Sequence, residues 1–204
     1  MAKIKLTKNE LKKQRDNLRR FTRYLPTLEL KKKQLIQEVR TVQDLIDKLQ
    51  GEIDEIESQM DAWVGVFAQE VDWPNLLVIK EVQVDQGNIA GIDIPIFRDV
   101  VFERPPYDFF ETPLWVDQAI EVLEELIRKR AEIRVAEQQQ EVLREELRIT
   151  IQRIKLFEEI KIPEARENIR VVRIFLGDQM TAEMVRGKIA KSQLERKKAE
   201  SAPA

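Results

Sequence analysis

Lysine, arginine, aspartate and glutamate are the side chains of this sequence that could do chemistry, because it contains neither cysteine nor histidine. Disulfides, thiolate nucleophiles, imidazole bases and the usual zinc ligands are therefore excluded. Gly87 and Gly91 could suggest a phosphate-binding loop, but no Gly-Lys-Ser/Thr sequence follows them. We expect no catalytic, cofactor or metal site in this chain.

Basic side chains gather toward both ends of the sequence. Residues 1–33 hold 12 basic and 3 acidic side chains, whereas residues 34–72 hold 2 basic and 10 acidic ones, and residues 161–198 are again basic. Such a cluster has three open interpretations: a solvated face, a surface that tracks nucleic-acid phosphates, or a surface for an acidic protein partner. The near-neutral total and the few aromatic residues argue against nucleic acid.

A long helix is predicted over residues 8–67. Thr7 and Glu10 have the spacing of a capping box at its start. Apolar residues then recur in alternating steps of three and four, with Lys32 as the exception, and this mean spacing of 3.5 is typical of a coiled coil. These positions, hereafter the seam, are Leu18, Phe21, Leu25, Leu28, Lys32, Leu35, Val39, Val42, Ile46, Leu49, Ile53, Ile56, Met60, Trp63 and Phe67. Pro26 lies inside this run, and because the seam keeps its phase there we expect a kink rather than a helix end.

Residues 68–114 interrupt this pattern and contain five of the eight prolines. "LLVIKEVQV" and "NIAGIDIPIF" are rich in β-branched residues and flank "DQGN", so we expect a β-hairpin with its turn at residues 85–88. "ERPPYDFFETP" is expected to connect the hairpin to the next helix.

A second helix is predicted over residues 115–192, with a break near Gly177, and residues 193–204 are expected to be a flexible tail. Its seam is less regular, because a polar stretch at residues 137–141 separates its apolar positions. The predicted seam positions are Val116, Ala119, Leu123, Leu126, Ile133, Leu147, Ile151, Ile154, Ile169 and Val172.

Two seams joined by a short insert can bury each other if the helices fold back. The sequence therefore predicts a mainly α fold: a long antiparallel two-helix coiled coil with a small β-hairpin insert at the closed end. Facing residues should have numbers that sum to about 183, which brings Pro26 to within two turns of Pro163. No segment reads as a signal peptide or a membrane span.

Three blocks of the sequence resemble one known family, the D subunit of the V-type rotary ATPases, and most of all its bacterial branch. They are "KIKLTKNELKKQRDNLRRFTRYLPTLELKKKQL", "NIAGIDIPIF" and "RIKLFEEIKIPEARENIRVVRIFLGD". The resemblance implies a non-catalytic rotor in the central stalk, standing inside a hexamer of A and B subunits. It also implies contacts with the small F subunit and with a funnel-shaped subunit on the membrane ring. The chain would then be cytoplasmic and peripheral to the membrane through the complex.

Two surfaces are the candidate partner-binding sites under this interpretation, with no nucleic acid bound and no membrane insertion. The first, hereafter the basic track, would face the hexamer and comprises Arg19, Arg20, Arg23, Lys31, Lys32, Lys33, Arg166, Arg170 and Arg173. The second is the hairpin insert, at Val84, Gly87, Asn88, Gly91 and Pro95. The alternative function is a coiled-coil scaffold or nucleic-acid-binding arm unrelated to an ATPase.

Overall fold

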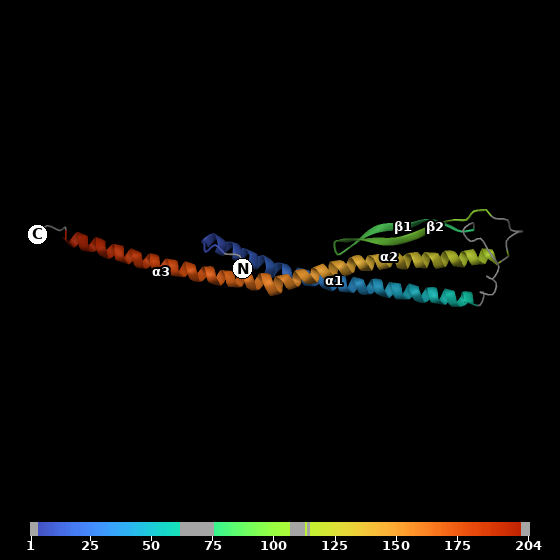
Figure 1. The fold of residues 1–204 in the computed structure, drawn as a ribbon, viewed down its shortest axis with the longest axis horizontal. Coiled ribbons are helices and arrows are strands. Elements are labelled where there is room, and N and C mark those ends of the chain that lie inside the picture. The colour runs from blue at the N-terminus through green and yellow to red at the C-terminus, as the bar shows by residue number, and fades with distance from the viewer. Residues whose placement is uncertain (1–3, 62–75, 107–112, 114, 201–204) are drawn as a thin grey trace. The chain divides into compact units, whose positions relative to one another are not determined.

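The computed structural model describes residues 4–61, 76–106, 113 and 115–200. Its elements are α1 (Lys8–Asp61), β1 (Val78–Ile89), β2 (Ile92–Glu103), α2 (Val116–Lys155), the π-helix η2 (Leu156–Lys161) and α3 (Ile162–Glu200) (Figure 1). The predicted fold class, mainly helical with a two-stranded antiparallel hairpin, is confirmed. The chain divides into two compact units, residues 30–150 (the central unit) and residues 1–29 with 151–204 (the terminal unit).

Helix α1 begins at the predicted cap and runs through Pro26. The backbone N–H of Glu10 donates to Thr7 Oγ1 at 3.2 Å, which satisfies one of the unpaired donors of the first turn. Every seam position from Leu18 to Met60 is buried or half-buried, Lys32 included. The predicted spacing of 3.5 residues is therefore confirmed to Met60, while Trp63 and Phe67 lie outside the described residues.

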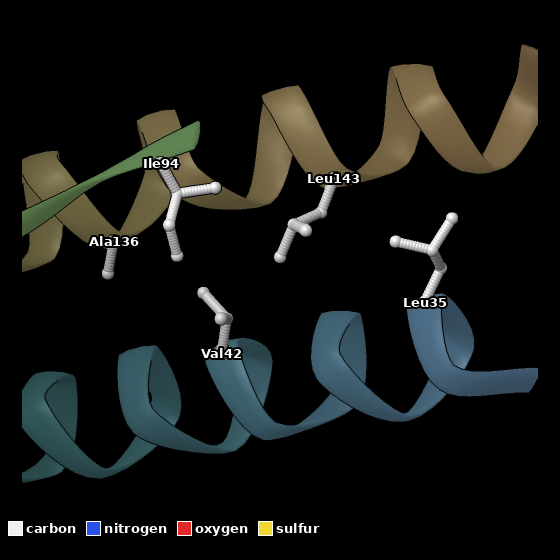
Figure 2. Close-up of a cluster of buried hydrophobic side chains, with 5 residues drawn as sticks. All are labelled: Leu35, Val42, Ile94, Ala136 and Leu143. Carbon is white, nitrogen blue, oxygen red and sulfur yellow. The ribbon is translucent and has the colours of Figure 1, made fainter. Parts of the chain in front are cut away.

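The core of the central unit lies between α1 and α2. Leu35 and Val42 from α1 face Ala136 and Leu143 from α2, and Ile94 of β2 completes the cluster (Figure 2). Leu35 and Leu143 are fully buried. Complete burial of one such side chain contributes about 1.5–3 kcal/mol to folding. This cluster therefore stabilises the packing of α1, α2 and β2 in the central unit.

Polar pairs between α1 and α2 show that the helices run antiparallel. Lys31 pairs with Glu146 at 2.9 Å, Gln43 with Gln140 at 2.7 Å and Glu52 with Lys129 at 2.5 Å. Residue numbers thus fall along α2 as they rise along α1. The Gln43–Gln140 pair has the predicted sum of 183, and the other two lie within about two turns of it.

In the terminal unit the N-terminal part of α1 packs against η2 and the first half of α3. The rings of Phe21 and Phe157 lie 5.2 Å apart between centroids, and Asn168 approaches Gln14 at 3.5 Å. Beyond this contact, residues 177–197 of α3 are all exposed. None of the helices in the described ranges has a stretch that is long and apolar enough to cross a membrane.

The predicted helix break near Gly177 is wrong, because α3 continues from Ile162 to Glu200. A glycine inside a helix costs only about 0.5–1 kcal/mol relative to alanine, and the residues around Gly177 include strong helix formers that offset this. Residues 193–200, predicted as part of a flexible tail, are also helical, and residues 201–204 lie outside the described part.

The hairpin exists, but its turn was predicted in the wrong place. Residues 85–88 belong to β1, and the two central residues of the turn are Ala90 and Gly91, with φ of 53° and 78°. Two-residue turns that match the twist of a hairpin need positive φ at both positions, and Gly91 adopts this without steric cost. The second part of the predicted connector, residues 107–112, lies outside the described residues.

Candidate functional site

The basic track is divided between the two units. Arg19, Arg20 and Arg23 on α1 and Arg166, Arg170 and Arg173 on α3 all belong to the terminal unit, and all six are exposed. Arg166, Arg170 and Arg173 follow each other at steps of four and three, which places them on one face of α3. The three lysines of the track belong to the central unit.

Two of these lysines are engaged within the central unit. The Lys31 side chain is 28% exposed, and its ammonium pairs with the Glu146 carboxylate, which is 23% exposed. Lys32 is half-buried in the seam, whereas Lys33 is exposed. Lys31 and Glu146 lie on different helices, 115 residues apart in the sequence, so no local pattern predicts their ion pair. From the sequence alone, Lys31 is predicted only as a surface charge.

Arg170 is partly neutralised by its own helix. Its guanidinium donates two hydrogen bonds to the Glu167 carboxylate, at 2.8 and 2.6 Å, and these bonds lower the pKa of Glu167 and raise that of Arg170. Glu167 precedes Arg170 by three residues, which is the spacing of neighbours on a helix surface. This pair therefore reduces the net positive charge carried by the three arginines of α3.

Within the hairpin, three predicted binding residues serve the fold. Asn88 Oδ1 accepts the backbone N–H of Gly91 at 3.1 Å, and Asn88 Nδ2 donates to Asp93 at 2.7 Å, so Asn88 braces the turn. The carbonyl of Pro95 accepts a hydrogen bond from Gln139 of α2. Val84 is 44% exposed, whereas Gly87 lies against the side chain of Ile96.

Sequence reasoning missed the residues that attach the hairpin to α2. Ile94 is 3% exposed in the main core cluster. Arg104 pairs with the buried Glu124 at 2.6 Å, and Arg128 pairs with Asp99 at 3.3 Å while its guanidinium lies over the Phe102 ring. These contacts are all long-range in sequence, so the only available signal was an excess of isoleucine and valine in the strand.

Among the described residues, exposed apolar side chains gather beside β1 and along α3. A groove of about 640 Å³ separates β1 from α2 and is lined by Ile79, Val82, Val84, Ile127, Ala131 and Val135 among others. Along α3, large apolar side chains are 51–67% exposed at Met180, Met184, Val185, Ile189 and Leu194. Exposed apolar surfaces of this kind are typical of protein–protein contacts.

The perturbed ionisable groups belong to ion pairs on helix surfaces. A hydrogen bond from Lys129 lowers the pKa of Glu52, and the same bond raises the pKa of Lys129. Arg148 lowers the pKa of Glu145 in the same way. These pKa shifts have the direction expected when an ion pair stabilises both charged groups. The Glu52–Lys129 pair joins α1 to α2, whereas the Glu145–Arg148 pair lies within α2.

Comparisons with known proteins find similar sequences over almost the whole chain. The model of a family described as the D subunit of ATP synthase matches residues 10–192. The chain is 43% identical to a protein of Borreliella burgdorferi named as the D subunit of a V-type ATP synthase, over 97% of this chain and 98% of that protein. Proteins with the same name from Chlamydia caviae and Chlamydia abortus are 32% and 30% identical, each over 98% of both chains.

Proposed function

We propose that this chain, which belongs to the family of ATP synthase D subunits, is the rotor shaft in the central stalk of a V-type rotary ATPase or ATP synthase. In this role it couples ATP hydrolysis or synthesis in a catalytic hexamer to the translocation of protons or sodium ions. The observation that carries the proposal is the seam of α1, which is buried or half-buried from Leu18 to Met60 within a family match over residues 10–192. Because the chain belongs to an ATP synthase family, the rotor is proposed in preference to the alternative function, a scaffold or nucleic-acid-binding arm unrelated to an ATPase.

In this proposal the chain is a non-catalytic subunit that is peripheral to the membrane, and the A and B subunits perform the chemistry. A sequence without histidine or cysteine, whose perturbed carboxylates are in ion pairs, supports a mechanical role. Torque would pass through the interlocked seam side chains of the two helices. Cross-helix pairs such as Glu52–Lys129 and Glu57–Arg130 would resist sliding of one helix along the other.

The exposed parts of the terminal unit are the proposed hexamer-facing surface. Arginines such as Arg166 and Arg173 would attract carboxylates of the A and B subunits, and the uncovered apolar residues of α3 would lie against the wall of the hexamer. Exposed ion pairs contribute only about 0–1 kcal/mol each. Contacts of this strength can form and break in turn, as a rotating shaft requires.

The hairpin and the acidic stretch are proposed to meet the other stalk subunits. The small F subunit would pack against the side of the central unit, where acidic residues such as Asp44 and Asp54 are exposed. The hairpin, through Val84 and its groove, would contact the funnel-shaped subunit or regulate turnover. The side chain of Ile94 is excluded from this role because it belongs to the core.

Co-expression with the A, B and F subunits tests the assembly, and charge reversal tests the track. We expect the full chain to co-purify with these subunits, and we expect Arg166→Glu, Arg170→Glu and Arg173→Glu together to lower ATP-driven ion pumping per ATP hydrolysed. Reversal of an exposed cation outside the track, Arg40→Glu, is the control. Unchanged pumping and hydrolysis in the triple variant, with the helical circular-dichroism signal retained, would remove the basic track from the mechanism.

A further inference from the structure

A π-helix interrupts the regular helical ladder between α2 and α3. Within η2, Leu156–Lys161, the hydrogen bonds reach one residue further than in an α-helix, and the N–H of Ile162 donates to the carbonyl of Phe157, five residues back. Such a turn contains one residue more than the α-helical turn it replaces, and it is rare outside positions with a specific role. Neither the coiled-coil pattern nor the proposed rotor function accounts for it.

The burial pattern of the terminal unit contains the same extra residue. The buried or half-buried apolar positions that follow one another here are Ile154, Phe157, Ile162, Ala165, Ile169 and Val172. A two-helix seam advances by three or four residues at each step. All steps in this series obey that rule except the step from Phe157 to Ile162, which is five residues long and lies across η2.

Without the extra residue, a different face of α3 would meet α1. Continuing the regular steps from Phe157 would place Lys161, Glu164, Asn168 and Val171 in the seam. Each residue of an α-helix turns the chain by about 100°, so one extra residue rotates everything after it by that angle. The uninterrupted helix would bury Glu164 and expose Ile162 and Val172, which is unfavourable because a buried charge without a partner is costly.

Contacts at the start of η2 and beyond it both reach the N-terminal part of α1. The ring of Phe157, which precedes the extra residue in the chain, contacts the ring of Phe21. Asn168, after it, approaches Gln14. The same face of α1 therefore receives the chain on either side of the extra residue.

Pro163 explains why the extra residue lies at this position. Proline has no N–H, so the carbonyl four residues back, that of Glu159, lacks its α-helical donor in any case. A π-turn also leaves a carbonyl without a donor where the ladder returns to α-helical spacing. Placing both defects in one turn confines the loss of hydrogen bonding to one exposed part of the helix, since Glu158, Glu159 and Ile160 are exposed.

We propose that η2 is a register-setting element: it holds the one residue that the seam cannot accommodate and so turns the apolar face of α3 onto the N-terminal part of α1. The prediction is that the extra residue can be removed at η2 and nowhere else nearby. Deletion of Glu159 converts the π-turn into an α-turn and restores steps of three and four with every seam residue in place. Deletion of Glu167, an exposed glutamate of α3 in a surface ion pair with Arg170, is the comparison. It puts Ile169 and Val172 out of phase if η2 persists, and Ile162 and Ala165 out of phase if η2 becomes α-helical.

The test compares these deletions in the full chain by thermal unfolding. We expect the Tm of the Glu159 deletion within about 2 °C of the wild type, and that of the Glu167 deletion lower by roughly 5–10 °C. Deletion of Glu158 should behave like that of Glu159. Equal losses of Tm for the deletions inside and outside η2, or failure of both η2 deletions to fold, would overturn the proposal.

A crosslink reports the register directly, because the sequence contains no cysteine. Gln14→Cys with Asn168→Cys should be joined by a short bifunctional thiol reagent both in the wild-type background and in the Glu159 deletion. Gln14→Cys with Glu167→Cys is the control that should crosslink poorly, because Glu167 is exposed and lies two residues from the nearest seam positions, Ala165 and Ile169. Loss of the first crosslink on deletion of Glu159 would show that the π-turn does not set the register.

Discussion

Gln140 and Gln43 bond to each other across the helix pair of the central unit, with the amide nitrogen of Gln140 donating to the side-chain oxygen of Gln43 at 2.7 Å. Gln140 is 7% exposed and lies within the polar stretch of residues 137–141. The stretch therefore continues the interface: Gln140 is turned inward and paired with α1, Gln139 donates to the carbonyl of Pro95 in the hairpin, and Glu137, Gln138 and Glu141 are exposed.

This pair predicts a measurable coupling energy. Gln140→Ala leaves the Gln43 amide without this partner in a partly dry interface, so we expect a loss of about 1–3 kcal/mol in the free energy of unfolding. A double-mutant cycle with Gln43→Ala should return a coupling of about 0.5–1.5 kcal/mol by urea denaturation. Gln138→Ala is the exposed control, and equal effects of the Gln138 and Gln140 changes would contradict the buried pairing.

Ile94 should hold the hairpin on the helices. We expect Ile94→Ala to cost about 2–5 kcal/mol, because it removes a side chain from the main cluster and leaves a cavity. Ile96→Ala, in the same strand but at 44% exposure, should cost under about 1 kcal/mol. Chemical denaturation measures both, and a smaller loss at Ile94 than at Ile96 would show that the hairpin is not anchored through the core.

The Glu52–Lys129 pair should contribute to stability in a defined pH window. The pKa of Glu52 is lowered, so its contribution is present above the pKa of an unfolded glutamate and is lost as pH falls through the folded pKa. The pKa of Lys129 is raised, so its contribution is present below the unfolded value and is lost as pH rises through the folded one. We expect Glu52→Gln to flatten the fall of Tm below about pH 5, compared with the wild type.

The control for this change is Glu55→Gln, an exposed carboxylate on the same helix. It should leave the acid limb of the Tm profile close to that of the wild type. If the two variants have the same profile of Tm against pH, the ion pair between Glu52 and Lys129 does not contribute to stability in solution.

Pro26 is predicted to bend α1, a prediction that remains to be measured. Proline within a helix removes one hydrogen bond and crowds the carbonyl of Thr22. Pro26→Ala should restore that bond, raise Tm and reduce the local bend, which a crystal structure of the variant would measure. Pro163→Ala is the companion variant, and a bend that persists without Pro26 would assign its cause to the packing of the neighbouring helix.

The parts of the fold that follow from short-range periodicity could be predicted from the sequence. The seam from Leu18 to Met60 is a repeated local signal, and each turn of α1 adds to it, so the coiled coil and its pairing were predictable. The cap at Thr7 depends on residues only three positions apart. Such features need no knowledge of the rest of the chain.

Features that depend on one long-range choice could not be predicted in the same way. Residues 137–141 show no apolar pattern, so the sequence does not predict that Gln140 turns inward or that Leu143 is fully buried. Both depend on packing against the opposite helix. The turn at Ala90–Gly91 was displaced because "DQGN" carries a stronger turn signal than alanine followed by glycine. Gly177 carries the sequence signal of a helix end, but a glycine inside a long helix costs little stability, and α3 continues through it.

The candidate site was predictable as charge but not as pairing. Six arginines are exposed as the basic track requires, yet Lys31 bonds to Glu146 and Arg170 to Glu167. Only the i to i+3 spacing of the second pair was visible in the sequence. The five-residue step from Phe157 to Ile162 across η2 is likewise present in the apolar pattern, but one irregular step does not by itself predict a π-turn.

Rotation of this chain inside an assembled ATPase is the most direct test of its proposed role. Gln83→Cys would place a single thiol on the exposed strand β1 of the cysteine-free chain, outside the groove lined by Val84, and a probe attached there can be followed in surface-fixed complexes with the A and B subunits. We predict that the probe turns in one direction while ATP is hydrolysed and stops when ATP is removed. A complex that hydrolyses ATP at full rate while the probe stays still would contradict the account of the chain as a rotor.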